Sequence, residues 1–292
     1  MKPDTLQIIR FPERGGYFRR DRFRNVFSYL ILSIWSLIVL FPLWTMLVNS
    51  LKTQLQIFIN PFAFPKKFTL AGYLYVIGDG NFLLYFWNTL LVVAVTISGT
   101  LLIGSLAAYA LAHWKGVASR FIYILFLCGI MIPIRLGTIS IFQIIKSLGL
   151  MGSLYGLIPV YIAWGLPIAV FVLTTFIQEL PNELMESAAI DGASKLRIYS
   201  RITIPLIRPA LGTVAILNLI NIWNDIWFPL IFNLKEDQRT LLLGVTYFFG
   251  TYQTDWNKVL VVLTLSTLPI LILYVFMSKQ FIKGLTAGAI KG

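Results

Sequence analysis

The chain has 292 residues, of which 58% are hydrophobic and only 12% are charged, and its mean hydropathy is +0.79. Soluble domains carry about 25% charged residues, so this composition excludes an ordinary soluble protein. The apolar residues fall in blocks of about twenty, the length of a helix that spans a hydrocarbon core. The net charge of +12 clusters outside these blocks, which favours a positive-inside bias over nucleic-acid binding. We therefore predict an all-α, polytopic membrane protein.

The first 25 residues are polar and basic and include six arginines. The apolar run that follows, at residues 26–48, is too long for the core of a signal peptide and lacks an evident small-residue cleavage site. We predict a cytoplasmic basic segment over residues 1–25 and a first transmembrane helix that leaves the cytoplasm.

Further spans are predicted at residues 87–112, 120–144, 154–177, 209–232 and 256–277. The third is interrupted by Pro133, Arg135 and Gly137. Residues 49–86 and 235–255 are expected on the external side of the membrane. The two termini and the two inner loops then carry 16 of the 24 Lys and Arg residues. An even number of spans with both termini inside fits this distribution, and hydropathy gives six.

The longest charged stretch away from the N-terminus lies between the fourth and fifth spans, at residues 181–205. Pro181 is suited to the first position of a helix, and Glu183 and Glu186 follow where a helix N-terminus favours negative charge. Small and apolar side chains recur at i, i+4 spacing, so this short helix has one small, apolar face.

Gly192 is suited to end that helix in the left-handed conformation. A second helical stretch is expected over residues 194–202, and Pro205 is expected to close it. A charged helix-turn-helix beside a membrane is suited to docking a soluble partner.

The same stretch resembles the EAA loop of binding-protein-dependent ABC importer permeases. It has residues 186–188 (Glu-Ser-Ala), three residues, Gly192, nine residues, then residues 202–205 (Ile-Thr-Ile-Pro). The family pattern is Glu-Ala-Ala, three residues, Gly, nine residues, Ile, any residue, Leu-Pro. Ser187 replaces an Ala and Ile204 replaces the Leu, and both departures are mild.

The resemblance continues along the chain, which looks like a maltose-type (MalG-like) carbohydrate permease. The similar segments are residues 131–133 (Met-Ile-Pro), 148–150 (Leu-Gly-Leu), 221–230 (Asn-Ile-Trp-Asn-Asp-Ile-Trp-Phe-Pro-Leu) and 284–292 (Gly-Leu-Thr-Ala-Gly-Ala-Ile-Lys-Gly). It covers about residues 26–292, the predicted transmembrane permease domain, with a coupling loop at about 178–208. The resemblance also expects six spans.

The resemblance implies a multi-pass subunit of the bacterial cytoplasmic membrane with both termini in the cytoplasm. Its implied partners are a second related permease, two cytosolic ATPase subunits, membrane lipid and an external solute-binding protein that delivers a sugar. The residues implied to couple to the ATPase are Glu183, Glu186, Ala188, Ala189, Asp191 and Gly192.

The chain has no Walker-type phosphate loop, so ATP must be bound by another chain. It has one histidine, His113, without a ligand partner near it in sequence, and one cysteine, Cys128. We therefore expect no cofactor, no metal and no enzymatic activity in this chain.

Polar residues at membrane depth are costly and are expected to face a cavity or a partner. In the fifth span Asn218, Asn221 and Asp225 are spaced at i, i+3 and i+7, on one face of a helix. Amide and carboxylate groups bind sugar hydroxyls, and an indole stacks on a sugar ring. The flanking residues expected along the same substrate pathway are Trp223, Asn224 and Trp227.

Arg135 and Asp225 lie at similar predicted depths, about 22–24 Å from the inner ends of their spans at 1.5 Å per residue. We expect both to face one aqueous pathway, either as partners or as contacts for substrate, and an arginine there favours an acidic sugar. The alternatives are a structural ion pair for these two residues, and hydrogen bonds from Asn218 and Asn221 to neighbouring helices only.

Two other classes of function compete with the importer. A secondary transporter driven by an ion gradient usually shows an internal repeat and ionisable residues near the midplane, and no convincing repeat is present. An intramembrane enzyme needs paired carboxylates, a histidine cluster or a Ser/Lys constellation, and the predicted spans hold none.

Overall fold

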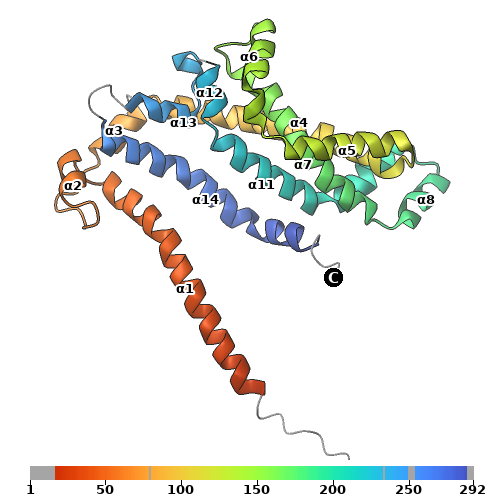
Figure 1. The fold of residues 1–292 in the computed structure, drawn as a ribbon, viewed down its shortest axis with the longest axis horizontal. Coiled ribbons are helices and arrows are strands. Elements are labelled where there is room, and N and C mark those ends of the chain that lie inside the picture. Colours follow the sequence, from red (N-terminus) through yellow and green to blue (C-terminus); the bar gives the residue numbers. More distant parts are fainter. Residues whose placement is uncertain (1–16, 79, 233, 249–253, 288–292) are drawn as a thin grey trace, which may run out of the picture.

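The computed structural model describes residues 17–78, 80–232, 234–248 and 254–287. Its regular structure is helical, as predicted from the composition (Figure 1). The α-helices are α1 (Tyr17–Ser50), α2 (Gln54–Ile59), α3 (Ala71–Gly78), α4 (Phe82–His113), α5 (Val117–Met131), α6 (Thr138–Ser147), α7 (Leu157–Gln178), α8 (Asn182–Ile190), α9 (Lys195–Ile198), α10 (Ile204–Leu206), α11 (Arg208–Trp223), α12 (Trp227–Ile231), α13 (Leu241–Val245) and α14 (Trp256–Ala287). A 3₁₀ turn covers Ile134–Gly137, and a π-helix covers Tyr199–Thr203.

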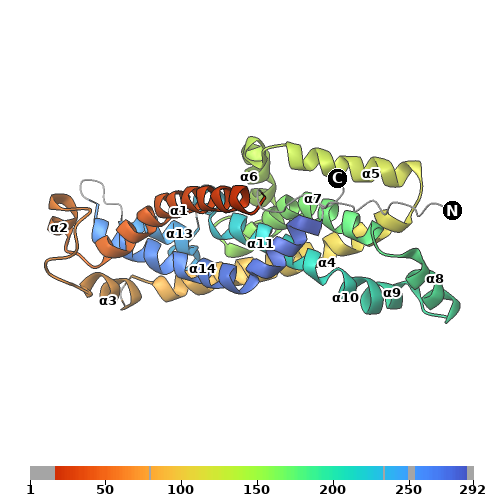
Figure 2. The same ribbon diagram turned by 90° about the horizontal axis from the view of Figure 1, so that it is seen from below.

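The long helices α4, α7, α11 and α14 lie side by side and form the body of the molecule (Figures 1 and 2). α4 and α7 pack along most of their lengths, and Ala108 and Ala169 are fully buried in a cluster with α11. The predicted inner loops, which carry α8 and the α4–α5 turn, lie at one end of this body. The predicted outer segments, with α2, α3 and α13, lie at the other.

Three helices are long and apolar enough to cross a membrane: Val26–Ser50, Phe82–His113 and Leu154–Gln178. Two bent helix pairs raise this number to five when each pair counts as one span. The described apolar part of α14, Trp256–Ile272, is shorter than a span. The described residues thus give a polytopic membrane protein with three to five candidate spans. Residues 1–16 of the predicted cytoplasmic segment and residues 288–292 of the C-terminal tail lie outside the described residues.

The third predicted span, residues 120–144, is broken at the interruption that the sequence predicts. The pair Val117–Met131 and Ile134–Ser147 bends by 91°, with Ile132 and Pro133 extended between the two helices. The Pro133 ring disfavours the helical conformation of the residue before it, so the helix ends there and the chain turns away as α6.

The prediction of a single helix over residues 209–232 is wrong. α11 ends at Trp223, and α12 begins after a break at Asn224, Asp225 and Ile226. Nor does Pro205 close the preceding helix, since it lies inside α10. A π-helix precedes it, and the chain bends by 74° between Lys195–Leu206 and Arg208–Trp223. A proline lacks a backbone N–H donor, and a π-bulge is one way in which a helix accommodates such a defect.

α1 diverges from the body and touches it chiefly at its C-terminal end, against α14 (Figure 1). That junction is closed by polar contacts. Asn257 of α14 donates its side-chain N–H groups to the carbonyls of Ser50, at 3.0 Å, and Lys52, at 2.6 Å. The buried ammonium of Lys52 donates to Asn49 Oδ1 at 2.8 Å and to the Asn60 carbonyl at 2.9 Å. Burial lowers the pKa of the Lys52 ammonium, and these bonds offset its desolvation.

We expect Lys52→Met to destabilise the protein by about 2 kcal/mol, because it leaves buried carbonyl and amide oxygens without their donor. Thermal unfolding in detergent measures the loss. Lys66→Met is the matched control, since Lys66 is exposed in the same segment. Equal melting temperatures for the two variants would show that the Lys52 contacts contribute nothing.

Candidate functional site

The charged segment folds as a helix-turn-helix. Pro181 is the N-cap rather than the expected first helical residue, and α8 begins at Asn182. Gly192 has φ +80°, the left-handed conformation predicted for it, and the next amide, of Ala193, donates to the Ala188 carbonyl at 2.9 Å. Ser194 then caps α9 by accepting from the Arg197 amide at 3.4 Å. The turn is therefore a defined structure with satisfied backbone groups.

The helix-turn-helix lies at one end of the molecule (Figure 2), and most of its residues are exposed. Ala188 is half-buried against the segment itself. The other residues expected to couple to a partner are exposed: Glu183, Glu186, Ala189, Asp191 and Gly192. Beside them Ile190 is 86% exposed and Leu196 is 68% exposed. Apolar side chains this accessible, ringed by charge, are typical of a protein–protein contact.

A buried tyrosine anchors this segment to the membrane helices. The hydroxyl of Tyr199 lies 2.7 Å from the hydroxyl of Ser105 on α4. Thr203 donates to the sulfur of Met185 at 3.8 Å and so ties the second helix to the first. These contacts link α8 to α4 through the chain that follows Gly192. Neither Tyr199 nor Thr203 was predicted as a site residue from the sequence.

Two cavities open between α5, α7 and α11. One, of about 470 Å³, is lined by Arg135, Asn221, Asn224 and Asp225 together with Trp164. The other, of about 300 Å³, is lined by Asn218 and Asn221 together with Tyr161. Asn221 belongs to both, so the cavities are neighbours. Tyr161 and Trp164 were missed because they lie within an apolar run, where tyrosine and tryptophan are ordinary core residues.

Arg135 and Asp225 share the larger cavity but form no ion pair at 4.0 Å or less in the described part of the chain. Asp225 is buried and accepts hydrogen bonds from the Tyr161 hydroxyl at 2.8 Å and from the amides of Trp227 and Phe228, both at 3.2 Å. It therefore caps α12 and joins it to α7. The expected helical face of three polar residues is broken, because Asp225 lies beyond the end of α11.

Arg135 instead lies over the ring of Trp227, with 5.6 Å from its guanidinium carbon to the ring centroid. The indole N–H of Trp227 donates to the Thr138 hydroxyl at 3.1 Å. An exposed guanidinium held on an aromatic face retains its hydrogen-bond donors for a ligand.

The remaining expected residues differ in their surroundings. Trp223 is buried, and its indole N–H donates to the Ser266 carbonyl on α14 at 3.2 Å, so it is a packing residue rather than a cavity residue. Asn218 is buried and donates to the Val214 carbonyl of its own helix. Asn224 is exposed and donates to the Ile220 carbonyl. Among the described residues no group of three His, Cys, Asp or Glu side chains is arranged to hold a metal ion.

We expect Asp225→Ala to destabilise the protein by about 2–3 kcal/mol, because three donors lose a buried, charged acceptor. Arg135→Ala removes a charge from the same cavity without breaking a hydrogen bond, so it serves as the control. Thermal unfolding of both purified variants measures the difference. An Asp225→Ala protein as stable as the parent would contradict the capping role.

Comparison with known proteins identifies the family. Residues 100–287 match the model of the binding-protein-dependent transport system inner membrane component. A protein of Caldicellulosiruptor sp. named as an ABC transporter permease is 38% identical over 265 residues, 90% of this chain and 96% of its own. The arabinooligosaccharides transport system permease protein AraQ of Bacillus subtilis is 31% identical over 267 residues, 90% of this chain and 94% of its own.

A solved chain has the same fold. It comes from the crystal structure of a bacterial ABC transporter involved in the import of the acidic polysaccharide alginate, and the TM-score is 0.79. The comparison covers 93% of this chain and 99% of that chain at 20% identity.

This family decides against the ion-gradient transporter and the intramembrane enzyme. The chain is a transport subunit, and ATP is bound by a separate ATPase subunit. The family model, the relatives and the fold agree that this chain belongs to the binding-protein-dependent inner membrane permeases of ABC importers, in the group that takes up carbohydrates.

Proposed function

We propose that this permease pairs with a second, related permease and two ATPase subunits, and moves a sugar or oligosaccharide across the bacterial cytoplasmic membrane by alternating access. An external solute-binding protein delivers the sugar. The observation that carries the proposal is the exposed α8–Gly192–α9 turn at one end of the bundle, tied to α4 by Tyr199.

The α8–α9 turn is the contact with the ATPase. Its exposed apolar pair, Ile190 and Leu196, enters a groove on the ATPase, and the acidic residues of α8 fix its orientation. Closure of the ATPase dimer displaces α8, and the Tyr199–Ser105 hydrogen bond passes that displacement to α4. A capped turn with fixed backbone transmits such a movement, whereas a flexible loop dissipates it.

Six spans, with both termini in the cytoplasm, are part of this proposal. They are α1, α4, α5 with its bent continuation, α7, α11 with α12 after it, and α14. In the most apolar stretch of α1, which has a mean hydropathy of 2.2, no residue is buried by the rest of the chain. An apolar helix that touches its own subunit chiefly at its C-terminal end supports a second permease that packs against the rest of it.

The substrate pathway includes the larger cavity. Irregular backbone at membrane depth is tolerated only where it is buried in protein or lines an aqueous cavity. Two helix breaks, at residues 132–133 and 224–226, both contribute to the lining of this cavity. Arg135, Asn221 and Asn224 supply hydrogen-bond donors and acceptors for sugar hydroxyls. Asn218 closes the smaller cavity beside it, and Trp223 is left out of the pathway.

Arg135 makes an acidic sugar the preferred substrate class. Its guanidinium is exposed, it faces the cavity, and no carboxylate neutralises it among the described residues. A charge-assisted, two-pronged hydrogen bond to a sugar carboxylate would compensate for placing this charge at membrane depth.

The coupling role is tested by Gly192→Pro in the assembled transporter. Proline cannot adopt φ +80°, and it removes the hydrogen bond from the Gly192 amide to the Ala189 carbonyl, so the turn is lost. We expect co-purification of the ATPase and ATP-driven uptake to be lost while membrane insertion is retained. Glu186→Lys, which reverses a charge on α8, is expected to reduce both co-purification of the ATPase and ATP-driven uptake.

Gly149→Pro is the matched control. Gly149 has φ +70°, and its amide donates to the carbonyl three residues earlier, as that of Gly192 does. It lies in the α6–α7 loop, at the proposed external side, so co-purification of the ATPase is expected to persist. Normal ATP-driven uptake by Gly192→Pro would remove the coupling role.

The pathway is tested by Arg135→Ala with a panel of neutral and acidic oligosaccharides in reconstituted vesicles. Because one charge-assisted hydrogen bond contributes about 1.5–3 kcal/mol, we expect uptake of the acidic sugar to fall by at least about tenfold, and neutral uptake to change little. Lys146→Ala is the control, since Lys146 is exposed on α6 and lines neither cavity. Unchanged uptake at normal expression would place Arg135 outside the pathway.

A further inference from the structure

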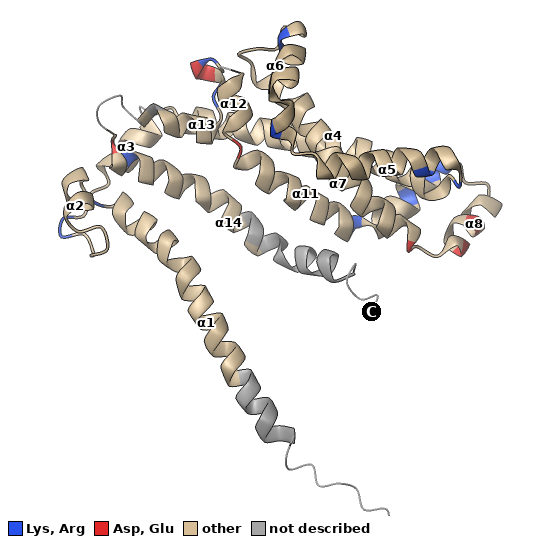
Figure 3. Cartoon of the chain, viewed as in Figure 1, with Lys and Arg blue, Asp and Glu red and all other residues tan. Residues whose placement is uncertain are grey.

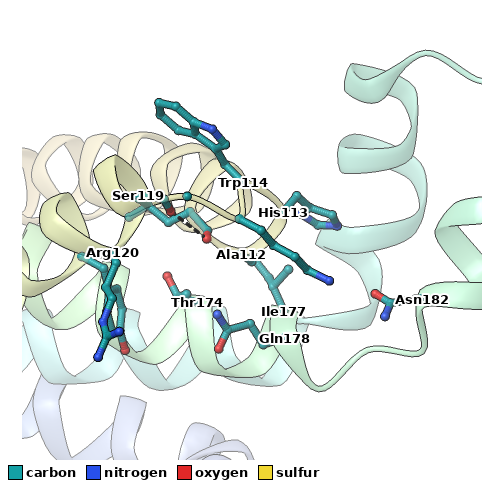
Figure 4. Close-up of a pocket in the computed structure, with 13 residues that line it drawn as sticks. Ala112, His113, Trp114, Ser119, Arg120, Thr174, Ile177, Gln178 and Asn182 are labelled. Carbon is teal, nitrogen blue, oxygen red and sulfur yellow. Dashed lines mark hydrogen bonds between the residues drawn. The ribbon is translucent and has the colours of Figure 1, made fainter.

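A third cavity, of about 550 Å³, lies at the end of the body that carries α8, apart from the proposed sugar pathway (Figure 4). It is enclosed by the α4–α5 turn, the start of α5, the end of α7 and the first residue of α8. None of its thirteen lining residues is acidic, whereas Lys115 and Arg120 are both basic. Neither the coupling contact nor the sugar pathway accounts for it.

The α4–α5 turn holds the mouth of this cavity open in a defined shape. Trp114 donates its amide to the Ala110 carbonyl at 2.9 Å and ends α4. The buried Ser119 hydroxyl donates back to the Leu111 carbonyl at 3.2 Å, which fixes the start of α5 against the end of α4. Gly116, the N-cap residue of α5, lines the cavity, and no side chain caps the helix there. A helix N-terminus of this kind attracts an anion.

A buried hydroxyl points to a ligand in the cavity. Thr174 of α7 is only 2% exposed, it lines the cavity, and its hydroxyl has no hydrogen-bond partner. Figure 4 shows it on the same helix as Gln178, with Arg120 on the neighbouring α5. A buried polar group without a partner costs about 1–3 kcal/mol, so this hydroxyl indicates a hydrogen-bonding occupant.

The electrostatic balance selects an anion. Lys115 and Arg120 are exposed, and neither forms an ion pair with a carboxylate among the described residues. Basic residues gather at this end of α5 (Figure 3). Together with the Thr174 hydroxyl and the Gln178 amide, they provide donors on several sides of one space. That set matches the oxygens of a phosphate group.

The surroundings select the source of the phosphate. Trp114, 58% exposed, flanks the cavity at the end of a membrane-spanning helix, where indoles lie at headgroup level. Beyond it α5 presents apolar side chains to the membrane, with Val117 at 89% and Phe121 at 66% exposure. We propose that this cavity binds the phosphate headgroup of an anionic phospholipid, with its acyl chains along α5. In the proposed topology the lipid belongs to the cytoplasmic leaflet.

The test uses the transporter purified with its partner subunits, delipidated in detergent, and titrated with short-chain phosphatidylglycerol. Binding is measured as the rise in melting temperature, with phosphatidylcholine as the neutral lipid. We expect phosphatidylglycerol alone to stabilise the complex, and Arg120→Gln to raise its apparent Kd by about tenfold. Lys146→Gln removes one charge outside the cavity and is expected to leave that Kd unchanged.

Thr174→Val separates a ligand contact from a structural role. The substitution nearly preserves shape and removes a hydroxyl that has no partner in the lipid-free protein. We expect the melting temperature without lipid to be unchanged or higher, while the Kd for phosphatidylglycerol rises by about fivefold.

Equal Kd values for the parent, Arg120→Gln and Thr174→Val would overturn the site. Stabilisation by inorganic phosphate, with the same dependence on Arg120 and Thr174 and without an effect of phosphatidylglycerol, would overturn the lipid as its source. Both readouts are binding measurements. They do not depend on whether α8 couples to the ATPase.

Discussion

The contact between α4 and α7 is the constraint on which the rest of the structure depends. At Gly104 of α4 the two helices are so close that a Cβ atom there would lie 2.9 Å from the Cβ of Ala169 on α7. Both proposed functional regions are bonded to this pair of helices. The proposed sugar cavity is bonded through Tyr161 of α7 and Asp225, and the proposed coupling turn through Tyr199 and Ser105 of α4. Two tyrosine hydroxyls thus connect the cavity and the α8–α9 turn to one packed unit, and we expect a tilt of α4 and α7 together to reach both at once.

The long helices and the coupling turn followed from local sequence. Blocks of apolar residues located α4 and α7 to within a few residues, since hydropathy reports burial in lipid directly. The left-handed Gly192 was also predicted, because a short helix followed by glycine needs no distant contact to stop there.

The breaks were harder to predict, because their cause lies elsewhere in the chain. Asp225 in an apolar run is compatible with a water-filled path and equally with a cap for the next helix. Tyr161, 64 residues earlier, supplies the donor that makes it a cap in this fold. Trp223 was assigned to the pathway for its sugar-stacking ring, yet the partner of its indole is a carbonyl 43 residues away. Pro133 marks the position of the bend, but nothing local in the sequence predicts its angle of 91°.

The first and last helices of the chain are joined to each other. α1 has few neighbours except α14, and Asn257 bonds the carbonyls of Ser50 and Lys52 from more than 200 residues away. During synthesis α1 can pack early only on the segment that follows it, where Phe41 stacks on Phe62 and Trp44 meets the edge of Phe64. Its contact with α14 has to wait until that distant helix has been made. Local packing and final docking of α1 are therefore separated in time, and a chain cut short before α14 would leave the second contact unmade.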